Sequence, residues 1–283
     1  MATLIKKDSF GDAWKALLSE ILSNGKPVSP RDQETKELMN VAIEVVYGLD
    51  NVLLSPARNL NYRFMVAEWL WILAGFNDVE SLARYNRIMR QFSDDGQILS
   101  GAYGPRLLHQ WAYIGDTLQK KDSRQAVATI WTPNPKSSKD IPCTISLQWL
   151  IRDDHLHCTA NMRSSDIWLG LPYDFFTFSQ LTNCLSGFLG LPVGTVTMNL
   201  ASSHLYSRDY DIAIVALNGH WGTLNSPQIR DSIHQPTVMQ IKEILEQTEN
   251  VESSLHYPFN RYKESLEQDK EYALKVLREI SEL

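Results

Sequence analysis

The stretch from Ile141 to Asp174 reads IPCTISLQWLIRDDHLHCTANMRSSDIWLGLPYD, and it contains most of the residues that decide the fold. Two extended runs in it are joined by the polar pair Asp153-Asp154. In the second run every other residue from Leu156 to Met162 is apolar, which is the period of a β-strand. A Gly170-Leu171-Pro172 break follows, and a proline is favoured near the start of a helix. The stretch therefore predicts a hairpin followed by a helix.

Reactive side chains gather at the ends of these predicted elements. Cys143 precedes the first strand, and the pair Arg163-Ser164 follows the second. Asp166 and Asp174 lie on either side of the Gly-Leu-Pro break. Such positions hold reactive groups against a ligand while the scaffold stays rigid, so the set offers a nucleophile, an anion clamp and two polar contacts. The alternative is a core hairpin with a buried free cysteine, which packs as a small hydrophobic residue.

The ordered set of motifs along the chain resembles the thymidylate synthase family of pyrimidine-nucleotide C5 transferases. The resemblance covers roughly residues 28 to 210. The matching pieces are Glu68-Trp69-Leu70-Trp71, Ala102-Tyr103-Gly104, Asp122-Ser123-Arg124, Pro142-Cys143 with Gln148, Arg163-Ser164-x-Asp166, Leu169-Gly170-Leu171-Pro172 and Ser203-His204-Leu205-Tyr206-Ser207. Any one of them is weak evidence, but their order and spacing are specific.

The resemblance implies an α+β fold in layers, with a large mixed or antiparallel sheet packed against helices. One face of that sheet is expected to form a homodimer interface. We expect residues 1–210 to form the catalytic core, and residues 211–283 to form a helical C-terminal extension packed on the same domain. Apolar spacing independently predicts helices over 9–23 and 62–74 and a strand over 38–46. We also expect a helix within 76–100 and one over 175–190, with Phe188 on its apolar face. The chain is expected to end in helices over 238–247 and 260–283.

The catalytic roles that the resemblance implies begin with Cys143, whose thiolate would add to C6 of the pyrimidine. We expect an arginine-rich pocket to lower its pKa. Glu68 stands alone in an apolar helix, where burial should raise its pKa, so it is expected to act as general acid/base. A helix glutamate that reaches solvent is the alternative. Tyr103 is expected near the nucleophile.

The remaining carried-over residues are expected to bind the nucleotide and the folate. Those for the nucleotide are Arg31, Arg124, Arg163, Ser164, Asp166, His204 and Tyr206. Within that set the histidine and tyrosine would contact the sugar, and Arg124 would reach the partner subunit's phosphate site, which implies a homodimer. Those for the folate are Arg58, Asp166 and Gly170. The expected cofactor is 5,10-methylenetetrahydrofolate, and surface charges remain the alternative for Arg31 and Arg124.

Asp174 differs from the residue that thymidylate synthases have at this position, and this difference is the basis for predicting the substrate. Thymidylate synthases have an asparagine here, eleven residues after Arg163, and an amide fits the edge of uracil. A carboxylate accepts from the N4 amino group of cytosine, and a shared proton would satisfy N3. Deoxycytidylate hydroxymethylases carry aspartate at this place, so we expect dCMP as the substrate. A helix-start carboxylate favoured by the macrodipole is the alternative.

Two further departures concern the product. Ile88-Met89 replaces the tryptophan that synthases place over the folate, and the usual C-terminal tail is not visible in residues 277–283. Both suggest that water enters, so we expect hydroxymethylation rather than methylation. Methylation of dCMP or dUMP is the alternative within the family. A nucleotide- or RNA-binding protein without turnover is the alternative of another class, but it would be expected to lack Cys143 or to be basic.

Composition sets outer limits on these hypotheses. The 283 residues are 43% hydrophobic and 21% charged, as in a globular protein, and the net charge of −6 argues against nucleic-acid binding. The three cysteines lack the spacing of metal ligands, so they predict no metal site, and they suit a reducing cytoplasm better than a disulfide scaffold. The hydroxymethylases that the chain resembles are known from phages, and for a phage protein this compartment would be the cytoplasm of the host. No run long enough to span a membrane is present.

Overall fold

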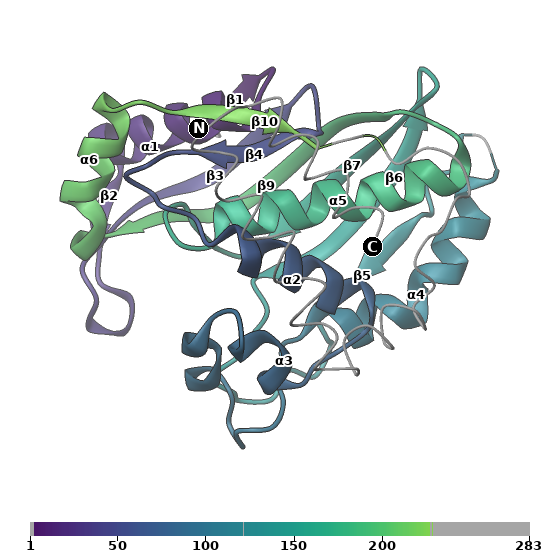
Figure 1. Ribbon diagram of the computed structural model, residues 1–283, viewed down its shortest axis with the longest axis horizontal. Helices are drawn as coiled ribbons and strands as arrows, with labels where there is room; N and C mark the ends of the chain where they lie inside the picture. Colours follow the sequence, from purple (N-terminus) through teal and green to yellow (C-terminus); the bar gives the residue numbers. More distant parts are fainter. Residues whose placement is uncertain (1–2, 121, 227, 229–283) are drawn as a thin grey trace.

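The computed structural model describes residues 3–120, 122–226 and 228. A mixed sheet forms its centre, with helices packed against it (Figure 1). The helices are α1 (Phe10–Asn24), α2 (Tyr62–Leu73), α3 (Val79–Ala83), α4 (Tyr103–Leu118), α5 (Leu171–Leu189) and α6 (Tyr210–Asn218), with short 3-10 turns η1 (Pro30–Asp32), η2 (Arg87–Gln91) and η3 (Ser207–Asp209). The expected α+β class is confirmed.

The main sheet has eight strands, and six of them form the continuous order β1-β3-β9-β7-β6-β5. Strand β2 pairs with β3, and β8 with β9, while β4 and β10 form a separate pair. The strands are β1 (Thr3–Lys7), β2 (Lys26–Val28), β3 (Thr35–Val45), β4 (Asp50–Leu54), β5 (Val127–Thr129), β6 (Thr144–Arg152), β7 (His155–Met162), β8 (Ser165–Asp166), β9 (Val193–Tyr206) and β10 (Gly222–Asn225). The β7–β9 and β1–β3 pairs are parallel, and the β3–β9 and β6–β7 pairs are antiparallel, so the sheet is mixed.

The predicted hairpin is present as β6 and β7. Arg152 pairs with His155, and the two loop residues Asp153 and Asp154 have φ values of 49° and 55°. Two consecutive residues with positive φ form the turn whose twist matches paired strands, and aspartate tolerates that conformation. The register shifts between Thr144 and Ser146, immediately after Cys143. Such an irregularity re-aims the chain beside a site.

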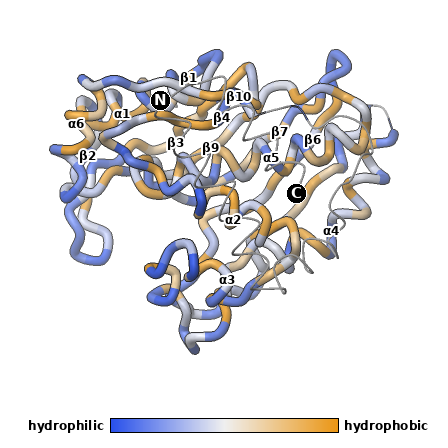
Figure 2. The backbone as a smooth tube through the Cα atoms, viewed as in Figure 1, coloured by the Kyte–Doolittle hydropathy of each residue, from blue (hydrophilic) through white to orange (hydrophobic). Residues whose placement is uncertain are grey.

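One face of the sheet is buried beneath α1 and α5. Leu147, Ala160 and Met198 from three neighbouring strands are at most 1% exposed on it. The indole of Trp149 donates to the Thr182 hydroxyl of α5 at 3.0 Å. This face holds the core, and Figure 2 shows apolar residues along these strands and helices. The predicted helices over 9–23 and 62–74 and the strand over 38–46 are confirmed within one to three residues at each end.

The opposite face of the sheet carries polar residues. Thr159, Asn161 and Asn199 lie on it, half-buried or exposed, and the Asn199 amide donates to Asn161 Oδ1 at 3.0 Å. This polar row leaves a broad face of the described chain without a helix over it.

Two sequence expectations about helices need correction. Phe188 was predicted on the buried face of α5, but it lies near the last turn and is 47% exposed. The predicted helix within residues 76–100 is two short pieces, α3 and η2, separated by Arg84–Asn86. The Asp78 and Asn86 side chains each accept a backbone N–H, so each begins a new turn instead of continuing the previous one.

Residues 210–226 pack on the same domain. Helix α6 contacts α1, and β10 pairs with β4. Ser226 lies buried at the end of this segment, where its hydroxyl donates to Asn51 at 2.7 Å and accepts from Gln180 at 2.5 Å. The helices expected over 238–247 and 260–283 lie outside the described residues. Among the helices that are described, none is both long enough and apolar enough to cross a membrane.

Candidate active site

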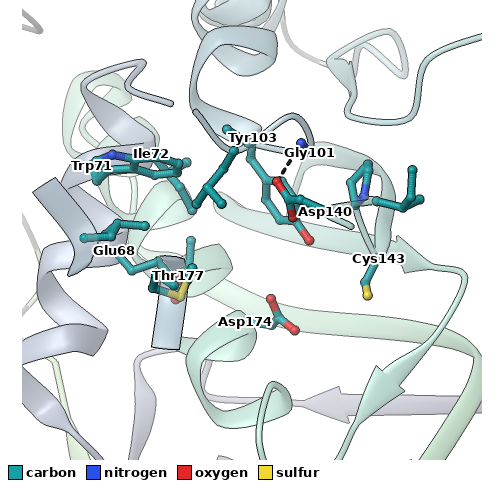
Figure 3. Close-up of a pocket in the computed structure, with 15 residues that line it drawn as sticks. Glu68, Trp71, Ile72, Gly101, Tyr103, Asp140, Cys143, Asp174 and Thr177 are labelled. Atoms are coloured by element: carbon teal, nitrogen blue, oxygen red, sulfur yellow. Dashed lines mark hydrogen bonds between the residues drawn. The ribbon is translucent and has the colours of Figure 1, made fainter. Parts of the chain in front are cut away.

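A pocket of about 170 Å³ lies between α2, the start of α4, the loop before β6 and the start of α5. Glu68, Tyr103, Cys143 and Asp174 all line it, so the four residues predicted to be catalytic come together from four segments of the chain. Figure 3 shows Tyr103, Cys143 and Asp174 arranged around one space, with Asp140 beside them. The apolar wall consists of Trp71, Ile72, Leu82, Met89, Leu99, Ile141 and Pro142.

Cys143 is half-buried at the last position before β6. The Ser164 hydroxyl lies 3.7 Å from its sulfur and donates to it. Burial raises the pKa of the Cys143 thiol, and the charge of Asp174 raises it further, while Arg163 and Ser164 act in the opposite direction. The expectation that an arginine-rich pocket lowers this pKa is therefore wrong for the free protein, because desolvation and a carboxylate outweigh one arginine.

Arg163 fixes the loop that carries the nucleophile. Its Nε donates to the Pro142 carbonyl and its Nη2 to the Ile141 carbonyl, both at 2.9 Å, and Nη1 donates to Ser164 Oγ at 3.1 Å. The guanidinium also lies over the Trp131 ring, 6.0 Å from its centroid. Arg163 is nevertheless exposed, so its charge remains accessible to an anionic ligand next to Cys143.

Glu68 and Asp174 form a pair of carboxyl groups inside the pocket. Burial raises the pKa of Glu68 to about 8, and the Asp174 charge adds to that rise. Burial also raises the pKa of Asp174 to about 7, with a further contribution from Asp166. Two neighbouring carboxyls near neutrality hold protons that a substrate can share. The expected rise in the pKa of Glu68 is confirmed.

Tyr103 begins α4 and is tied to the strand that follows the nucleophile. Its hydroxyl accepts from the Thr144 hydroxyl at 3.0 Å and from the Thr144 backbone N–H at 3.3 Å. Burial raises the pKa of Tyr103 well above its usual range, with Asp174 and Cys143 adding to it. The phenol therefore stays protonated and can donate a hydrogen bond into the pocket.

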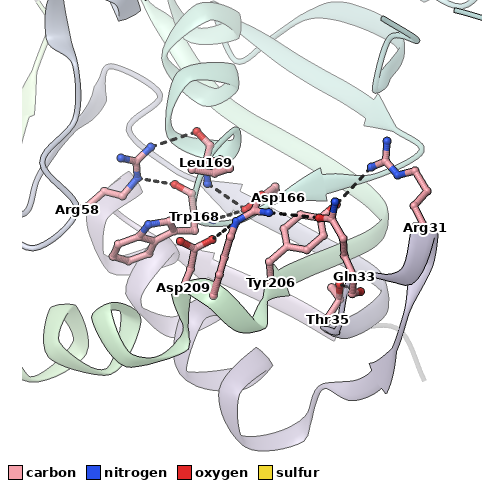
Figure 4. Close-up of polar contacts among 10 residues, drawn as sticks. Arg31, Gln33, Thr35, Arg58, Asp166, Trp168, Leu169, Tyr206 and Asp209 are labelled. Atoms are coloured by element: carbon pink, nitrogen blue, oxygen red, sulfur yellow. Dashed lines mark hydrogen bonds and ion pairs between the residues drawn. The ribbon is translucent and has the colours of Figure 1, made fainter. Parts of the chain in front are cut away.

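The residues expected at the sugar and phosphate form a second group beside the first. The His204 and Tyr206 rings meet edge to face at the end of β9, with centroids 5.3 Å apart. Arg31 donates to the Tyr206 hydroxyl at 3.4 Å (Figure 4). Asp166, Arg31 and Arg163 all act electrostatically on His204, so these groups share one neighbourhood. Arg124 stands apart from them, exposed before β5.

The residues expected at the folate surround the turn that leads into α5. Arg58 donates to the carbonyls of Trp168 and Leu169 and stacks over the Trp168 ring (Figure 4). Asp166 Oδ1 accepts the N–H groups of Trp168 and Leu169 at 2.9 and 3.0 Å. A Cβ on Gly170 would lie 3.5 Å from Asp174 Oδ2, so this turn adjoins the catalytic carboxyls.

The pair Ile88-Met89 divides between pocket and surface. Met89 lines the pocket, whereas Ile88 is 48% exposed. A methionine thus contributes to the apolar wall at the segment where the resemblance leads one to expect a tryptophan.

Asp140 is a charged residue of the pocket that was not predicted from the sequence. It lies three positions before Cys143 and lines the same cavity. The signal that could have identified it is a lone carboxylate directly before the apolar Ile141-Pro142 pair. Thr177 and Thr144 were also not predicted as site residues, and both place hydroxyl groups at or beside the pocket.

Comparison with known proteins agrees with this geometry. The family model described as thymidylate synthase matches residues 12–265. The chain is 33% identical over 219 residues to a deoxyuridylate hydroxymethyltransferase of Bacillus phage SP01, covering 70% of this chain and 57% of that protein. It is 30% identical over 202 residues to a deoxyuridylate hydroxymethyltransferase of Pseudomonas phage M6, covering 66% and 58%.

A putative thymidylate synthase of Methanococcoides burtonii is 26% identical over 211 residues, which is 74% of this chain and 91% of that protein. The matches to the two phage proteins span less than three fifths of their lengths. The family match itself extends over most of the chain and includes every element that lines the pocket. The chain belongs to the thymidylate synthase family.

Proposed function

We propose that this chain is a one-carbon transferase that hydroxymethylates C5 of dCMP, with 5,10-methylenetetrahydrofolate as donor. The observation that carries the proposal is the convergence of Cys143, Glu68, Tyr103 and Asp174 on one pocket. A thiol, a phenol and two proton-holding carboxyls are the groups needed to add a nucleophile to a pyrimidine and to move protons on its edge.

Cys143 acts first, by forming a bond from its sulfur to C6 of the pyrimidine. The negative charge of Asp174 is one cause of the raised pKa of this thiol. When Asp174 is neutral in contact with the base, its contribution disappears, while burial still raises the pKa of the thiol and Arg163 and Ser164 still lower it. Binding of the correct base would therefore remove one of the causes that keep the thiol protonated.

Asp174 and Glu68 then act on the edge of the ring. An Asp174 carboxyl with one proton donates to N3 of cytosine through one oxygen and accepts from the N4 amino group through the other. Glu68 lies beside it with a pKa of about 8, so it holds a proton at neutral pH and can exchange it with the ring. Tyr103 can donate a hydrogen bond to charge that develops next to the sulfur.

A reduced folate would lie on the apolar side of the pocket. Trp71, Leu82 and Met89 line that side, and a heteroaromatic ring can pack against such apolar side chains. Arg58, Asp166 and Gly170 would hold the folate where the turn before α5 adjoins the pocket. When bound, the folate supplies the one-carbon unit at the oxidation level of formaldehyde.

The nucleotide phosphate would lie against Arg31, Arg163 and Ser164, and the sugar against His204 and Tyr206. We infer that the site is completed by Arg124 of a second copy, with the polar face of the sheet as the dimer interface. That face, with its row of threonine and asparagine side chains, is free of helices in the described chain. The three free cysteines agree with a reducing compartment such as the cytoplasm.

A second candidate substrate is dUMP, which the pKa of Asp174 and the names of two relatives favour. The pKa of Asp174 is raised to about 7, so the neutral form is well populated at neutral pH. A neutral carboxyl offers one donor and one acceptor, as an amide does, and can serve O4 and N3–H of uracil. Two relatives carry the name deoxyuridylate hydroxymethyltransferase.

The test is a direct assay of the purified protein with methylenetetrahydrofolate and dCMP, dUMP or CMP labelled with tritium at C5. Release of tritium reports C5 substitution, and the mass of the product distinguishes hydroxymethyl from methyl. We expect hydroxymethyl-dCMP as the main product. Release from dUMP alone would reject the dCMP assignment, and release from none of them would reject the transferase.

A further inference from the structure

Asp140 is a third carboxyl group in the active-site pocket, and the mechanism above does not use it. It is half-buried, and it lines the same cavity as Glu68 and Asp174. Its charge acts on the Cys143 thiol, which places it within electrostatic reach of the nucleophile. A partly desolvated carboxyl beside a reactive cysteine is costly unless it is used or paired.

The contacts of Asp140 fix its position closely. Its Oδ2 accepts the backbone N–H of Gly101 at 2.6 Å, and its own N–H donates to Ser138 Oγ at 3.0 Å (Figure 3). A Cβ on Gly101 would come within 2.7 Å of the Asp140 carbonyl, so only glycine lets the two segments approach this closely. Within residues 3–120, 122–226 and 228, Oδ1 receives no hydrogen bond and remains available.

Asp140 also borders a second cavity. A hollow of about 490 Å³ lies under residues 131–138 and shares Asp140, Ile141 and Pro142 with the active-site pocket. Its other polar lining includes Arg106, which donates to the carbonyls of Ser100 and Ile130. Asp140 is therefore the charged residue in the wall between the catalytic pocket and a space large enough to hold several water molecules.

We propose that Asp140 is the base that accepts a proton from water when hydroxyl is added to the one-carbon unit on C5. This inference rests on the proposed hydroxymethylation. The water oxygen forms a bond to the exocyclic CH₂ carbon, and the electron pair of the C5=CH₂ double bond moves into the ring towards C4. The water proton passes to Asp140. The electron pair then returns to re-form C5=C6 and expels the Cys143 sulfur, which takes up a proton.

Asp140 suits this role better than the other two carboxyls. Glu68 and Asp174, with pKa values of about 8 and about 7, exchange protons near neutral pH and are assigned to the edge of the base. Burial raises the pKa of Asp140 as well, while the Gly101 N–H and Arg106 act in the opposite direction. The geometry separates the roles, because Asp140 lies on the side of the pocket that adjoins the second cavity.

The test compares Asp140→Asn with Asp140→Ala in the full-length protein. Asparagine keeps an oxygen for the Gly101 N–H but is not a base, whereas alanine removes both functions. The first readout is exchange of the C5 tritium of dCMP into water without any methylene donor, which requires only Cys143 addition and loss of the C5 proton. The second readout is hydroxymethyl product with the donor present. The third readout is the thioether product formed when 2-mercaptoethanol is added to the assay. Its thiolate can attack the exocyclic CH₂ carbon in place of water, and a thiolate has no proton for a base to remove.

For Asp140→Asn we expect exchange within about threefold of the unchanged protein, hydroxymethyl product lower by about 100-fold, and restored turnover with the thiol as a thioether product. Asp140→Ala should lose exchange as well, because the Gly101 contact is gone. Normal hydroxymethylation by Asp140→Asn would overturn the proposal. Equal loss of exchange in both variants would also overturn it, because Asp140 would then only position the nucleophile. Absence of both exchange and product in the unchanged protein would instead reject the proposed function.

Discussion

Glu68 and Asp174 line one pocket, and the charge of Asp174 helps to raise the pKa of Glu68 to about 8. Asp174 itself has a pKa of about 7, which is raised by burial and by Asp166. The pair therefore carries at least one proton near neutral pH. Because these carboxyls lose their protons near neutral pH, both nucleotide binding and the stability of the fold should depend on pH.

Binding of both dCMP and dUMP should weaken as the pH rises through about 7. Neutral Asp174 can donate to one atom and accept from the next on either base. Its ionised form still accepts from the cytosine amino group or from uracil N3–H, but it repels cytosine N3 or uracil O4. The dissociation constant of each nucleotide, measured from about pH 6 to pH 9, should rise several-fold. Dissociation constants that do not vary with pH would contradict the assignment of Asp174.

The Asp174→Asn variant should prefer dUMP at every pH. An amide cannot donate to N3 and accept from N4 of cytosine in the orientation that serves uracil, and a mispaired polar contact costs about 1–3 kcal/mol. We expect the dCMP:dUMP ratio of kcat/KM to fall by about 10- to 100-fold. Competition between the two nucleotides in one mixture measures this ratio, and the weakening of binding between about pH 6 and pH 9 should disappear because an amide does not ionise.

The Glu68→Gln variant should gain stability relative to the unchanged protein as the pH rises. Folding raises the pKa of this carboxyl from 4.5 to about 8, so between those values the folded state binds a proton that the unfolded state does not. Unfolding free energy then falls with pH across this window, by up to about 1.4 kcal/mol per pH unit. Urea unfolding near pH 6 and near pH 8 should show the difference between variant and parent growing by about 1–2 kcal/mol. An equal difference at both values would contradict the raised pKa.

Cys143→Ala should abolish tritium exchange at C5, with a loss of about 1000-fold or more, because no other thiol lines the described pocket. Cys184→Ala is the matched control. Cys184 is buried in α5 away from the pocket lining, so its removal should lower the unfolding free energy by about 1 kcal/mol and leave exchange in place. Exchange that survives in Cys143→Ala would remove the covalent mechanism.

Mixing two inactive variants tests whether each active site contains Arg124 from the second subunit of a dimer. Arg124→Glu would weaken phosphate binding in the partner's site, and Cys143→Ala would inactivate its own. Refolding them together should restore about a quarter of the parent activity, because half of the dimers would be mixed and each would contain one intact site. No gain on mixing would show that Arg124 serves its own chain or none.

Gly101→Ala should disturb the pocket through Asp140. The added methyl group would lie 2.7 Å from the Asp140 carbonyl, so one segment must move. We expect hydroxymethylation to fall at least tenfold and the unfolding free energy to fall by about 1–3 kcal/mol. Gly222→Ala, where nothing lies within 4 Å, is the matched control and should leave both quantities unchanged.

The sequence predicted the elements whose patterns are local. The β6–β7 hairpin follows from period-two apolar residues and an Asp-Asp turn, and the start of α5 follows from Pro172. Glu68, Tyr103, Cys143 and Asp174 are far apart in the chain but line one pocket. This could be predicted only because their motifs resemble those of a family whose fold brings them together.

The rest depended on contacts that no local pattern encodes. Asp140 has no periodic signal, and its place in the pocket depends on a hydrogen bond from Gly101, 39 residues away. The direction of the Cys143 pKa shift depends on how burial and Asp174 balance Arg163, which composition does not reveal. Phe188 fits the helical spacing of a buried face, yet its ring is exposed near the last turn of α5, where it borders an open cavity with Leu118 and Ile151.

The pairing of β10 with β4 has a practical consequence for anyone who shortens this protein. Cleaving the chain at the end of the motifs quoted above, near residue 210, would remove β10, the strand that pairs with β4. It would also remove Ser226, which forms hydrogen bonds with the buried Asn51 and Gln180 side chains. A fragment that keeps these buried contacts therefore has to run at least through Ser226, and a domain boundary drawn from motifs alone would remove them.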